Sequence, residues 1–467
     1  MKESAEKIWD IIVIGGGPAG MMAAGRAAEV AREQKEIGAI SRDVSILLLE
    51  KNSTLGKKLL ITGGGRCNVT NAEFDIRTLL AKFKNSDKFL FSAFSQHSVK
   101  ETLEFFHDHD MPTKVEEGKR VFPESNSAQS VWDVLVNQLK THKITVRSNA
   151  AVAGFIQTKP AQIDAVKLAD GEIIRGRNFI LATGGTSHPE TGSTGDGYAW
   201  LTKIGHKVGQ PQAALVPVEV KDSWVKQLSG FSLPTAKITL FQNDAKNGGI
   251  IKIPGKNAVK KGKVLFTHFG LSGPAILNMS SEIGELLKYG EVILSLDLLP
   301  ALAYDMLNET LIKLFKKESN KMFKNVLSES VKSGTGTSIS SPLIPAPLIP
   351  SVLEKSGIDG DTFCHSISRE ERLNLVKILK DMRITLTGLL GSDKAIVASG
   401  GVALEEIEWK NMRSRLVPNL HIIGDILDIN RPSGGYSLQL CWTTGWVAGT
   451  AAGTSAVSVA NESTILK

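Results

Sequence analysis

The chain has 467 residues, of which 42% are hydrophobic and 22% are charged. This composition is typical of a globular protein, and the length exceeds what one hydrophobic core usually serves, so we expect two or three domains. The net charge of +7 is small for this length, and no run of five basic residues occurs. The charge therefore suits an anionic cofactor or substrate, and we expect no nucleic-acid partner.

Cysteine and histidine usage argues against disulfide and metal chemistry. The three cysteines, Cys67, Cys364 and Cys441, form no CxxC pair, and an odd count does not suit a disulfide framework. His107 and His109 belong to no ligand motif, so we expect no metal site. We expect a cytoplasmic protein.

Two segments bear on membrane attachment. The first ten residues contain no apolar signal segment. Residues 432–460 carry no charge but are rich in Gly, Ser and Thr. A spanning helix needs about 20 mostly apolar residues, so we predict a buried helix beside a cofactor and no membrane partner.

The N-terminal region has the pattern strand, glycine turn, helix. An apolar strand is expected at 11–14, followed by Gly15-x-Gly17-x-x-Gly20 and an Ala-rich helix over 21–32. In such a motif Gly15 permits the tight turn, Gly17 lets a pyrophosphate approach, and Gly20 allows close packing of helix on strand. Pro18 and Ala19 lie within this motif and are expected to contact the cofactor, and the free N–H groups at the helix N-terminus favour a phosphate. The sequence thus predicts a dinucleotide site.

A second strand, 44-VSILLLE, ends in an acidic residue. Glu50 is placed to accept hydrogen bonds from an adenosine ribose, and Lys51 follows it in the expected cofactor site. Glu50 lies 30 residues after Gly20, where about 20 is usual. The connection between the helix and this strand is therefore unusually long.

The rest of the chain predicts inserted domains and a return to the first one. Residues 61–71, with three consecutive glycines, are expected to lack regular structure, and helices are expected around 86–108 and 127–141. Residues 144–181 read as a β-meander, 208–300 as mostly strand, and 301–385 as mostly helix, with a Ser/Pro/Gly-rich loop at 333–351. Apolar runs ending in glycine recur at 395–401 and 420–424.

We therefore expect an α/β fold in which both chain ends form a Rossmann-type FAD-binding domain. A β-rich domain and a small helical domain are inserted into it. The expected domains are 1–207 and 386–467 for the FAD-binding domain, 208–300 for the β-rich domain and 301–385 for the helical one.

Two later strand ends favour FAD over a nicotinamide as the bound dinucleotide. The segment 421-HIIGDILDI resembles the flavoprotein strand whose Asp holds the ribitol, and 179-FILATGG resembles the segment that closes over the same dinucleotide. Together with the glycine motif at 15–20, these two segments would then all contact one extended cofactor. No second strand–GxGxxG–helix unit occurs between 150 and 330, so NAD(P)H is expected only as a transient reductant.

At this level of detail the chain resembles the YhiN/HI0933-like family of bacterial FAD-dependent oxidoreductases, which includes aminoacetone oxidases and BaiN-type reductases. The resemblance extends from end to end, and it implies an FAD-binding domain that carries a β-barrel-like domain and a small helical domain. The matching segments are 61-ITGGGRCNVTN, 118-GKRVFPESNSA, 181-LATGGTSHPETGSTGDGYAW, 265-LFTHFGLSGPAIL, 398-ASGGV and 424-GDILDINRPSGGYSLQ.

The resemblance implies a set of cofactor contacts. Those facing the flavin would be Gly64, Arg66, Cys67 and Asn68, and the adenine would meet the backbone of Val152. Thr183, Gly184 and Gly185 would pass the ribose and pyrophosphate, and Asp425, Gly435, Tyr436 and Ser437 would approach the ribitol and the isoalloxazine. The chain departs from the family in having Gly424-Asp425 for Gly-Glu, 434-GGYS for GGYN, and Asn430-Arg431-Pro432 in the same loop.

The catalytic residues are not assigned by the sequence. Cys67 could contact the flavin or fill a tight space, and His268 could donate a proton or pack at a domain junction. We expect an FAD-dependent oxidoreductase that transfers hydride to or from a small organic substrate, as an oxidase or an NAD(P)H-dependent reductase. The alternatives are a flavin-dependent RNA-modifying protein and a non-catalytic flavin-binding protein. The sequence leaves the oligomeric state open.

Overall fold

The computed structural model describes residues 7–83, 85–210, 212–244, 249–253, 258–328, 330–332, 338–391 and 397–465. The chain divides into two compact units, one combining Met1–Ala214 with Ser392–Lys467 and the other spanning Leu215–Gly391. The predicted fold class is confirmed: both chain ends build a Rossmann-type α/β unit, and a barrel with helices is inserted between them. The expected boundaries after residues 207, 300 and 385 stay predictions.

The first unit is built on five parallel strands. They are, in order across the sheet, β6 (Thr145–Arg147), β2 (Ile46–Leu49), β1 (Ile8–Ile14), β9 (Ile173–Leu181) and β23 (Leu420–Ile422). Ile14, Leu49, Leu181 and Ile422 end their strands in register with their neighbours. Four carboxyl ends therefore meet at one edge of the sheet, where α/β proteins bind their ligands.

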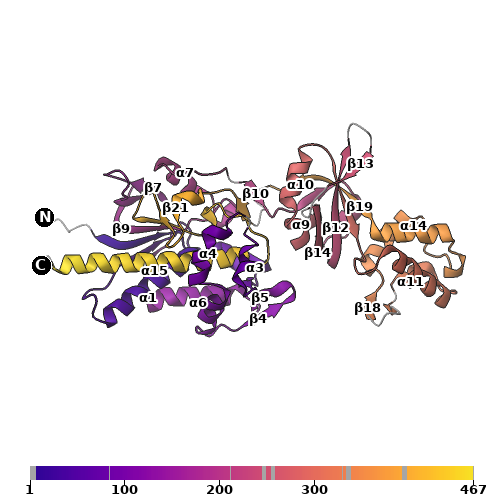
Figure 1. The fold of residues 1–467 in the computed structure, drawn as a ribbon, viewed down its shortest axis with the longest axis horizontal. Helices are drawn as coiled ribbons and strands as arrows, with labels where there is room; N and C mark the ends of the chain where they lie inside the picture. The colour runs from indigo at the N-terminus through magenta and orange to yellow at the C-terminus, as the bar shows by residue number, and fades with distance from the viewer. Residues whose placement is uncertain are drawn as a thin grey trace. The chain divides into compact units, whose positions relative to one another are not determined.

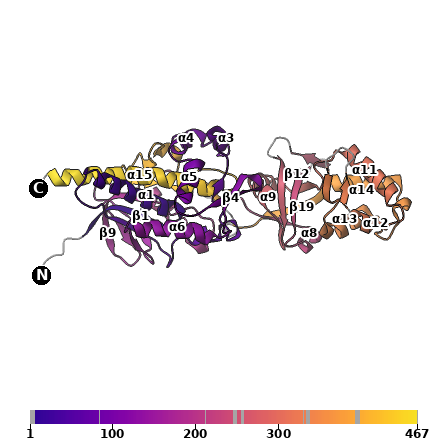
Figure 2. The same ribbon diagram turned by 90° about the horizontal axis from the view of Figure 1, so that it is seen from below.

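Two long helices cover this sheet. These are α1 (Pro18–Glu36) and α15 (Tyr436–Ile465), which lie side by side along much of their length (Figures 1 and 2). A third, α6 (Ala128–Thr141), packs against α1. Helix α1 is longer than the predicted 21–32 because Pro18 can occupy the first helical turn without needing its missing N–H.

Smaller elements complete the first unit. Antiparallel strands extend the sheet: β7 (Val152–Ile156) and β8 (Ala165–Leu168) beside β9, and β21 (Ile407–Glu408) and β22 (Arg413–Ser414) beside β23. Separate small sheets are formed by β3 (Thr70–Asn71), β5 (Arg120–Pro123) and β4 (Thr113–Glu116), and by β10 (Gln212–Ala214) with β20 (Val397–Ser399). The remaining helices are α2 (Lys57–Ile61), α3 (Ile76–Leu80), α4 (Asp87–Gln96), α5 (Val99–His107) and α7 (Asp196–Lys203).

Two expectations for this unit need correction. The β-meander predicted over 144–181 is right for β7, β8 and β9 but wrong for β6, which pairs in parallel with β2. Residues 61–71 are not wholly irregular, since a short 3-10 turn forms at Thr62–Gly64 and β3 follows at Thr70–Asn71. Parts of the apolar run at 395–401 and of the loop at 333–351 lie outside the described residues.

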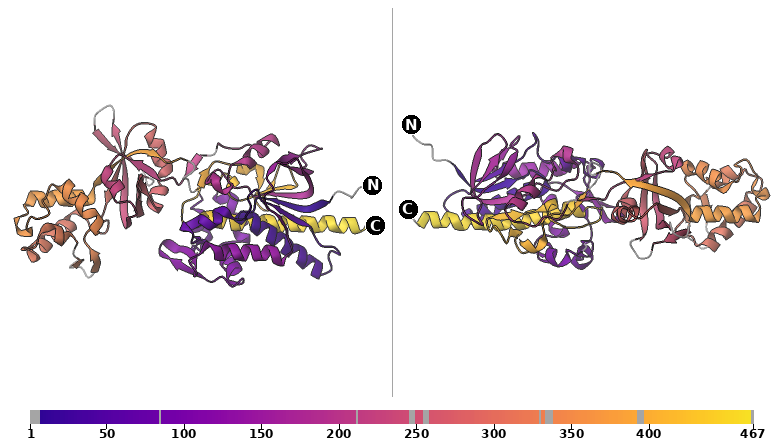
Figure 3. Two further views of the ribbon diagram at one scale, coloured as in Figure 1. Left: turned by 180° about the vertical axis from the view of Figure 1, so that it is seen from behind. Right: turned by 90° about the horizontal axis from the view of Figure 1, so that it is seen from above.

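The second unit is an antiparallel barrel with helices packed on it (Figure 3). Its closed circuit of strands is β12 (Ser232–Asp244), β14 (Val259–Phe266), β15 (Gly270–Ser272), β11 (Val218–Val220), β19 (Met382–Leu389) and β16 (Val292–Asp297). β13 (Gly249–Lys252) pairs with the outer side of β12, and β17 (Ser330–Lys332) forms a hairpin with β18 (Ser338–Pro342). The helices are α8 (Ser223–Gln227), α9 (Pro274–Leu277), α10 (Ser280–Leu287), α11 (Tyr304–Lys317), α12 (Phe323–Leu327), α13 (Ile349–Ser356) and α14 (Arg369–Lys380).

One hydrophobic core joins the barrel to the helices that follow β16. Barrel residues such as Ile238 and Leu294 are buried in the same cluster as Leu311 on α11 and Leu375 on α14. The helical segment expected at 301–385 therefore shares its core with the barrel.

Candidate functional site

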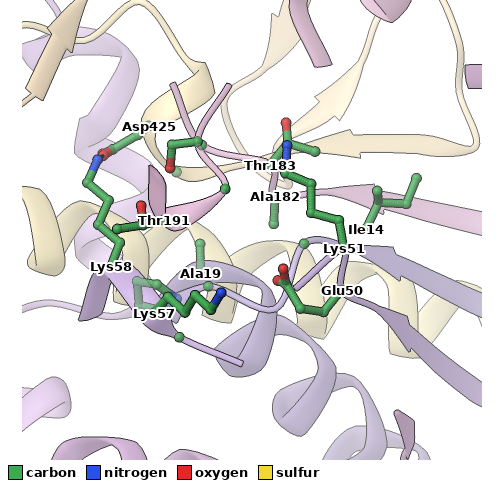
Figure 4. A pocket seen from close by; sticks show the side chains of 18 of the residues that line it. Ile14, Ala19, Glu50, Lys51, Lys57, Lys58, Ala182, Thr183, Thr191 and Asp425 are labelled. Carbon is green, nitrogen blue, oxygen red and sulfur yellow. Dashed lines mark ion pairs between the residues drawn. The ribbon is translucent and has the colours of Figure 1, made fainter. Parts of the chain in front are cut away.

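A cavity opens at the carboxyl ends of the parallel strands in the first unit. It encloses about 1220 Å³ of space, counting its open mouth. Figure 4 shows side chains from the ends of β1, β2 and β9, and from the loop after β23, turned toward it. Its lining residues include Gly15, Gly17, Pro18, Ala19, Glu50, Lys51, Lys57, Lys58, Val152, Thr183, Gly184, Asp196, Asp425, Ser437 and Cys441. The cavity thus joins chain segments more than 400 residues apart in the sequence.

The glycine loop between β1 and α1 has the geometry that its motif predicts. Gly15 has φ +105°, and a Cβ there would lie 2.5 Å from the carbonyl oxygen of Ala182. A Cβ on Gly20 would lie 1.9 Å from the carbonyl oxygen of Gly15. Gly17 caps α1 with no neighbouring atom within 4 Å of its Cβ position. The loop is therefore closely packed against backbone at Gly15 and Gly20 and open at Gly17, which suits a phosphate group at the helix N-terminus.

Glu50 is held rigidly at the end of β2. One carboxylate oxygen accepts a hydrogen bond from the backbone N–H of Gly16 (2.8 Å). The other accepts from the backbone N–H (2.8 Å) and the side-chain amide (2.7 Å) of Asn52. An ionised carboxylate has about four acceptor positions, so Glu50 retains capacity to accept a ribose hydroxyl.

Lys51 lines the cavity and is paired within it. Its ammonium lies 2.8 Å from the carboxylate of Asp196, at the start of α7, and donates to the hydroxyl of Thr194. This pairing ties the end of β2 to the 192–196 loop, a contact that the sequence does not reveal.

Asp425 lies at the opposite side of the cavity from Glu50 (Figure 4). Its carboxylate pairs with the buried guanidinium of Arg431 and lies 3.7 Å from the ammonium of Lys58. Arg431 also donates to the hydroxyl of Ser437 (2.9 Å) and to the carbonyl of Ile429 (2.6 Å). The predicted ribitol residues Asp425 and Ser437 are therefore joined by a third residue, Arg431, whose side chain is only 1% exposed.

Thr183 supplies a polar atom without a protein partner. Among the described residues, its hydroxyl oxygen is buried and makes no hydrogen bond. Thr183 lines the cavity directly after β9. The hydroxyl is packed against α7, where a Cβ on Gly197 would lie 2.4 Å from its oxygen, so it is not exposed to the cavity.

The predicted flavin-facing segment around 64–68 is placed differently. Gly64 and Gly65 are exposed with φ of +69° and +84°, and Arg66 pairs with Glu116 and lies over the ring of Phe122. The side-chain oxygen of Asn68 is buried without a partner among the described residues. Within residues 61–71, only Thr62 lines the cavity.

Cys67 is fully buried and is not part of the cavity lining. Burial raises the pKa of its thiol to about 12, against a smaller opposite effect of the Thr62 hydrogen bond. The thiol is therefore protonated near neutral pH, which favours the packing interpretation of Cys67 over a catalytic one.

The remaining predicted residues also lie off the cavity lining. Gly185 is buried beyond Gly184. Gly435 has φ +100°, and a Cβ there would lie 2.4 Å from the backbone of Thr70. Tyr436 packs edge-on against Phe83, with ring centroids 6.0 Å apart. Gly435 and Tyr436 therefore fix the start of α15 against β3, close to the cavity residue Ser437.

His268 belongs to the second unit. It is exposed on the turn between β14 and β15, with its ring edge-on to Phe269. The cavity in the first unit does not include it.

Four charged residues of the site were not found by sequence reasoning. Lys57 and Lys58 line the cavity from α2, Asp196 lines it from α7, and Arg431 holds Asp425. The adjacent lysines were visible in the sequence, but no motif assigned them. Asp196 pairs with Lys51, 145 residues earlier, and Arg431 pairs with Asp425, 6 residues earlier. Only the fold defines these two pairs.

The cavity has the features that FAD requires. Glu50 has acceptor capacity for an adenosine ribose, and Gly17 at the N-terminus of α1 is open to a pyrophosphate. Asp425 and Ser437 offer a carboxylate and a hydroxyl at the other side. An extended dinucleotide could therefore contact each chain segment that meets here.

The described residues contain neither a metal-ligand cluster nor a membrane-spanning helix. No group of three or more His, Cys, Asp or Glu side chains among them could hold a metal ion. No helix within the described part of the chain is long and apolar enough to cross a membrane.

Comparison with known proteins identifies the family. The model of the HI0933-like protein Rossmann domain matches residues 9–451. The chain is 29% identical over 443 residues to the 3-dehydro-bile acid delta(4,6)-reductase of Clostridium scindens, covering 94% of this chain and 98% of that protein. It is 27% identical over 442 residues to the ribosomal RNA dihydrouridine synthase of Escherichia coli, covering 94% and 96%.

A solved structure agrees on the fold. The 3-ketosteroid delta1-dehydrogenase of Sterolibacterium denitrificans, in complex with 1,4-androstadiene-3,17-dione, is 12% identical with a TM-score of 0.50. The match covers 96% of this chain and all of that one. At this identity it supports the architecture alone. Because the family model matches nearly the whole sequence, the chain belongs to the HI0933-like family of oxidoreductases.

Proposed function

We propose that the chain is an FAD-dependent reductase that saturates an activated C=C bond, with NAD(P)H as the transient electron donor. The observation that carries the FAD assignment is the cavity at the four strand ends. There the open Gly17 loop and the fixed Glu50 carboxylate line one cavity together with Asp425 and Ser437. When bound, FAD would supply the hydride-transfer chemistry that no protein side chain provides.

The chain's own residues would bind and orient this cofactor. Glu50 would accept the ribose hydroxyls, and the N–H groups at the start of α1 would donate to the phosphates. Asp425 and Ser437, held by Arg431, would bind the hydroxyls of the ribitol chain. These contacts would fix the cofactor along its length.

The proposed electron donor follows from the organisation of the sequence. No second strand–GxGxxG–helix unit lies between 150 and 330, so a nicotinamide has no Rossmann unit of its own. NAD(P)H would therefore bind only for the time of hydride transfer and leave as NAD(P)⁺.

The proposed acceptor follows from what the named relatives have in common. A delta(4,6)-reductase and a dihydrouridine synthase both produce a saturated carbon–carbon bond from a C=C bond conjugated to a carbonyl group. The net reaction adds one hydride and one proton across that bond. We therefore propose a small organic substrate with a conjugated enone for this chain.

A second candidate is reduction of uridine in ribosomal RNA. It is favoured by the two relatives named ribosomal RNA dihydrouridine synthase, at 27% and 28% identity over most of their length. It would overturn our expectation of no nucleic-acid partner. The oxidase and the non-catalytic flavin-binding protein are the remaining alternatives from the sequence.

An anaerobic reduction experiment separates these functions. The FAD-loaded protein is mixed with NADH or NADPH without oxygen, and the flavin absorbance near 450 nm is followed. We expect bleaching by a nicotinamide and recovery on adding a steroidal or simple cyclic enone. Recovery only with ribosomal RNA lacking dihydrouridine would support the second candidate. Bleaching by amines alone, or by no donor, would contradict the reductase.

A further inference from the structure

Three lysines line the cofactor cavity, and they differ in their partners. Lys51 pairs with Asp196, and Lys58 bonds to Ser187 and lies 3.7 Å from Asp425. Lys57 makes no ion pair or hydrogen bond with any described residue, although it is only half-exposed in the same cavity. We propose that the Lys57 ammonium binds the pyrophosphate of FAD. This inference rests on the proposed function.

The backbone around Lys57 is tied directly to the glycine loop. The N–H of Gly56 donates to the carbonyl of Gly16 at 2.9 Å. A Cβ on Gly16 would lie 2.3 Å from the side chain of Leu55, so the two segments are in close contact. Trp132 holds the same turn by donating to the carbonyl of Leu55 at 2.9 Å. Lys57 therefore starts α2 from a point fixed beside the predicted phosphate loop.

The two adjacent lysines point to different parts of the cavity. In Figure 4 the Lys58 side chain reaches toward Asp425, whereas the Lys57 ammonium points toward the side where Ala19 and Glu50 lie. Ala19 belongs to the first turn of α1, where the free N–H groups favour a phosphate. Lys57 is thus directed toward the pyrophosphate position and Lys58 toward the ribitol position.

The charges in the cavity leave Lys57 available for an anion. Glu50 accepts from the Gly16 and Asn52 donors, Asp196 is paired with Lys51, and Asp425 is paired with Arg431. Each carboxylate that lines the cavity is therefore engaged by another group. A pyrophosphate would provide the negative charge that these contacts do not offer to Lys57.

The test compares ligands with and without the pyrophosphate. Wild type, Lys57→Gln and Lys57→Arg are prepared as full-length protein from which FAD has been removed (stripped protein). Their affinities for FAD, ADP and adenosine are then measured. The matched control is Lys88→Gln, which changes an exposed lysine on α4 outside the cavity. Thermal unfolding of each stripped variant verifies that the fold is intact.

We expect Lys57→Gln to weaken FAD and ADP by a similar factor, about ten-fold or more. Adenosine should bind as it does to wild type, and Lys57→Arg should recover most of the loss. The ADP affinity of wild type should also fall more steeply with salt than that of Lys57→Gln. Lys88→Gln should match wild type for all three ligands.

Two results would overturn the proposal for Lys57. One is an ADP affinity of Lys57→Gln within two-fold of wild type. The other is an equal loss of adenosine affinity, which would show a general distortion of the site. If wild type itself bound neither FAD nor ADP, the proposed function would fail before Lys57 was tested.

Discussion

Arg431 is a buried cation that holds two residues of the cavity lining, Asp425 and Ser437. Its guanidinium pairs with Asp425 and donates to Ser437, and its side chain is 1% exposed. Removing one partner of a buried ion pair leaves the other charge without compensation, which is costly. Lys58, at 3.7 Å from Asp425, offsets part of that cost. Arg431 therefore couples the stability of the first unit to the shape of the cavity.

We predict that Arg431→Gln lowers the free energy of unfolding of the cofactor-free protein by about 3 kcal/mol. The double variant with Asp425→Asn should lose less than the sum of the two single losses, because both charges are then absent. Urea denaturation measures all three, with Arg32→Gln as the control. Arg32 forms an exposed pair with Glu36 on α1 and should cost no more than about 0.5 kcal/mol. Equal losses for Arg431→Gln and Arg32→Gln would disprove the buried-pair argument.

At the residue scale, the sequence predicted best where a residue acts through the local backbone. Gly15 and Gly17 follow a strand, Glu50 ends the next strand, and their motif determines what they do. The roles of Lys57 and Arg431 could not be predicted, because they depend on which charged side chains of the neighbouring loops form ion pairs and which do not. Cys67 was expected beside the flavin from its motif, yet the fold buries it outside the cavity lining.

The packing of α1 on α15 depends on glycines spaced one turn apart. A Cβ on Gly445, Gly449 or Gly453 would lie 2.6, 2.5 or 2.9 Å from a carbonyl oxygen of α1. The small residues let the two helix backbones approach closely. This close packing explains why residues 432–460 are uncharged, although they form no helix that could span a membrane. Since both helices begin at the cavity, their contact also fixes the glycine loop between β1 and α1 relative to Ser437.

Gly449→Ala should therefore destabilise the protein, by about 1–3 kcal/mol, because the added methyl meets the carbonyl of Ala23 at 2.5 Å. In an open helical position the same change usually stabilises by up to about 1 kcal/mol. Gly25→Ala is the matched control, since its Cβ would meet only the Gln138 side chain at 3.8 Å. Thermal and urea unfolding should show opposite signs for the two variants. A stabilising Gly449→Ala would contradict this account of the helix pair.

At the element scale, prediction succeeded for strands with long apolar runs and failed where pairing is non-local. β1, β2 and the last three residues of β9 were recognisable because buried parallel strands contain continuous apolar runs. β6, Thr145–Arg147, has no such run, and only its pairing with β2 places it in the parallel sheet. The same limit applies to the short β3, which forms only because β5 pairs with it.

The whole molecule brings together chain segments that are far apart in sequence. The strand ends after Ile14, Leu49, Leu181 and Ile422 meet at one cavity, and the barrel unit is inserted between the last two. The sequence could predict that the chain returns to the first unit after the barrel, because each of the four strands ends in a recognisable polar or glycine-rich turn. It could not predict that the barrel and its following helices share one core, since that depends on packing between elements.

The central claim is that the cavity holds FAD, and Gly17 allows a direct measurement. Gly17 has an ordinary backbone conformation, with φ −76°, and its Cβ position is open. Gly17→Leu should therefore fold normally while its side chain fills the expected pyrophosphate position. The measurement is the ratio of FAD to chain after incubation with FAD and gel filtration. We predict a single FAD per chain for wild type and almost none for folded Gly17→Leu. Wild-type protein without FAD, or folded Gly17→Leu with the wild-type ratio, would contradict the account.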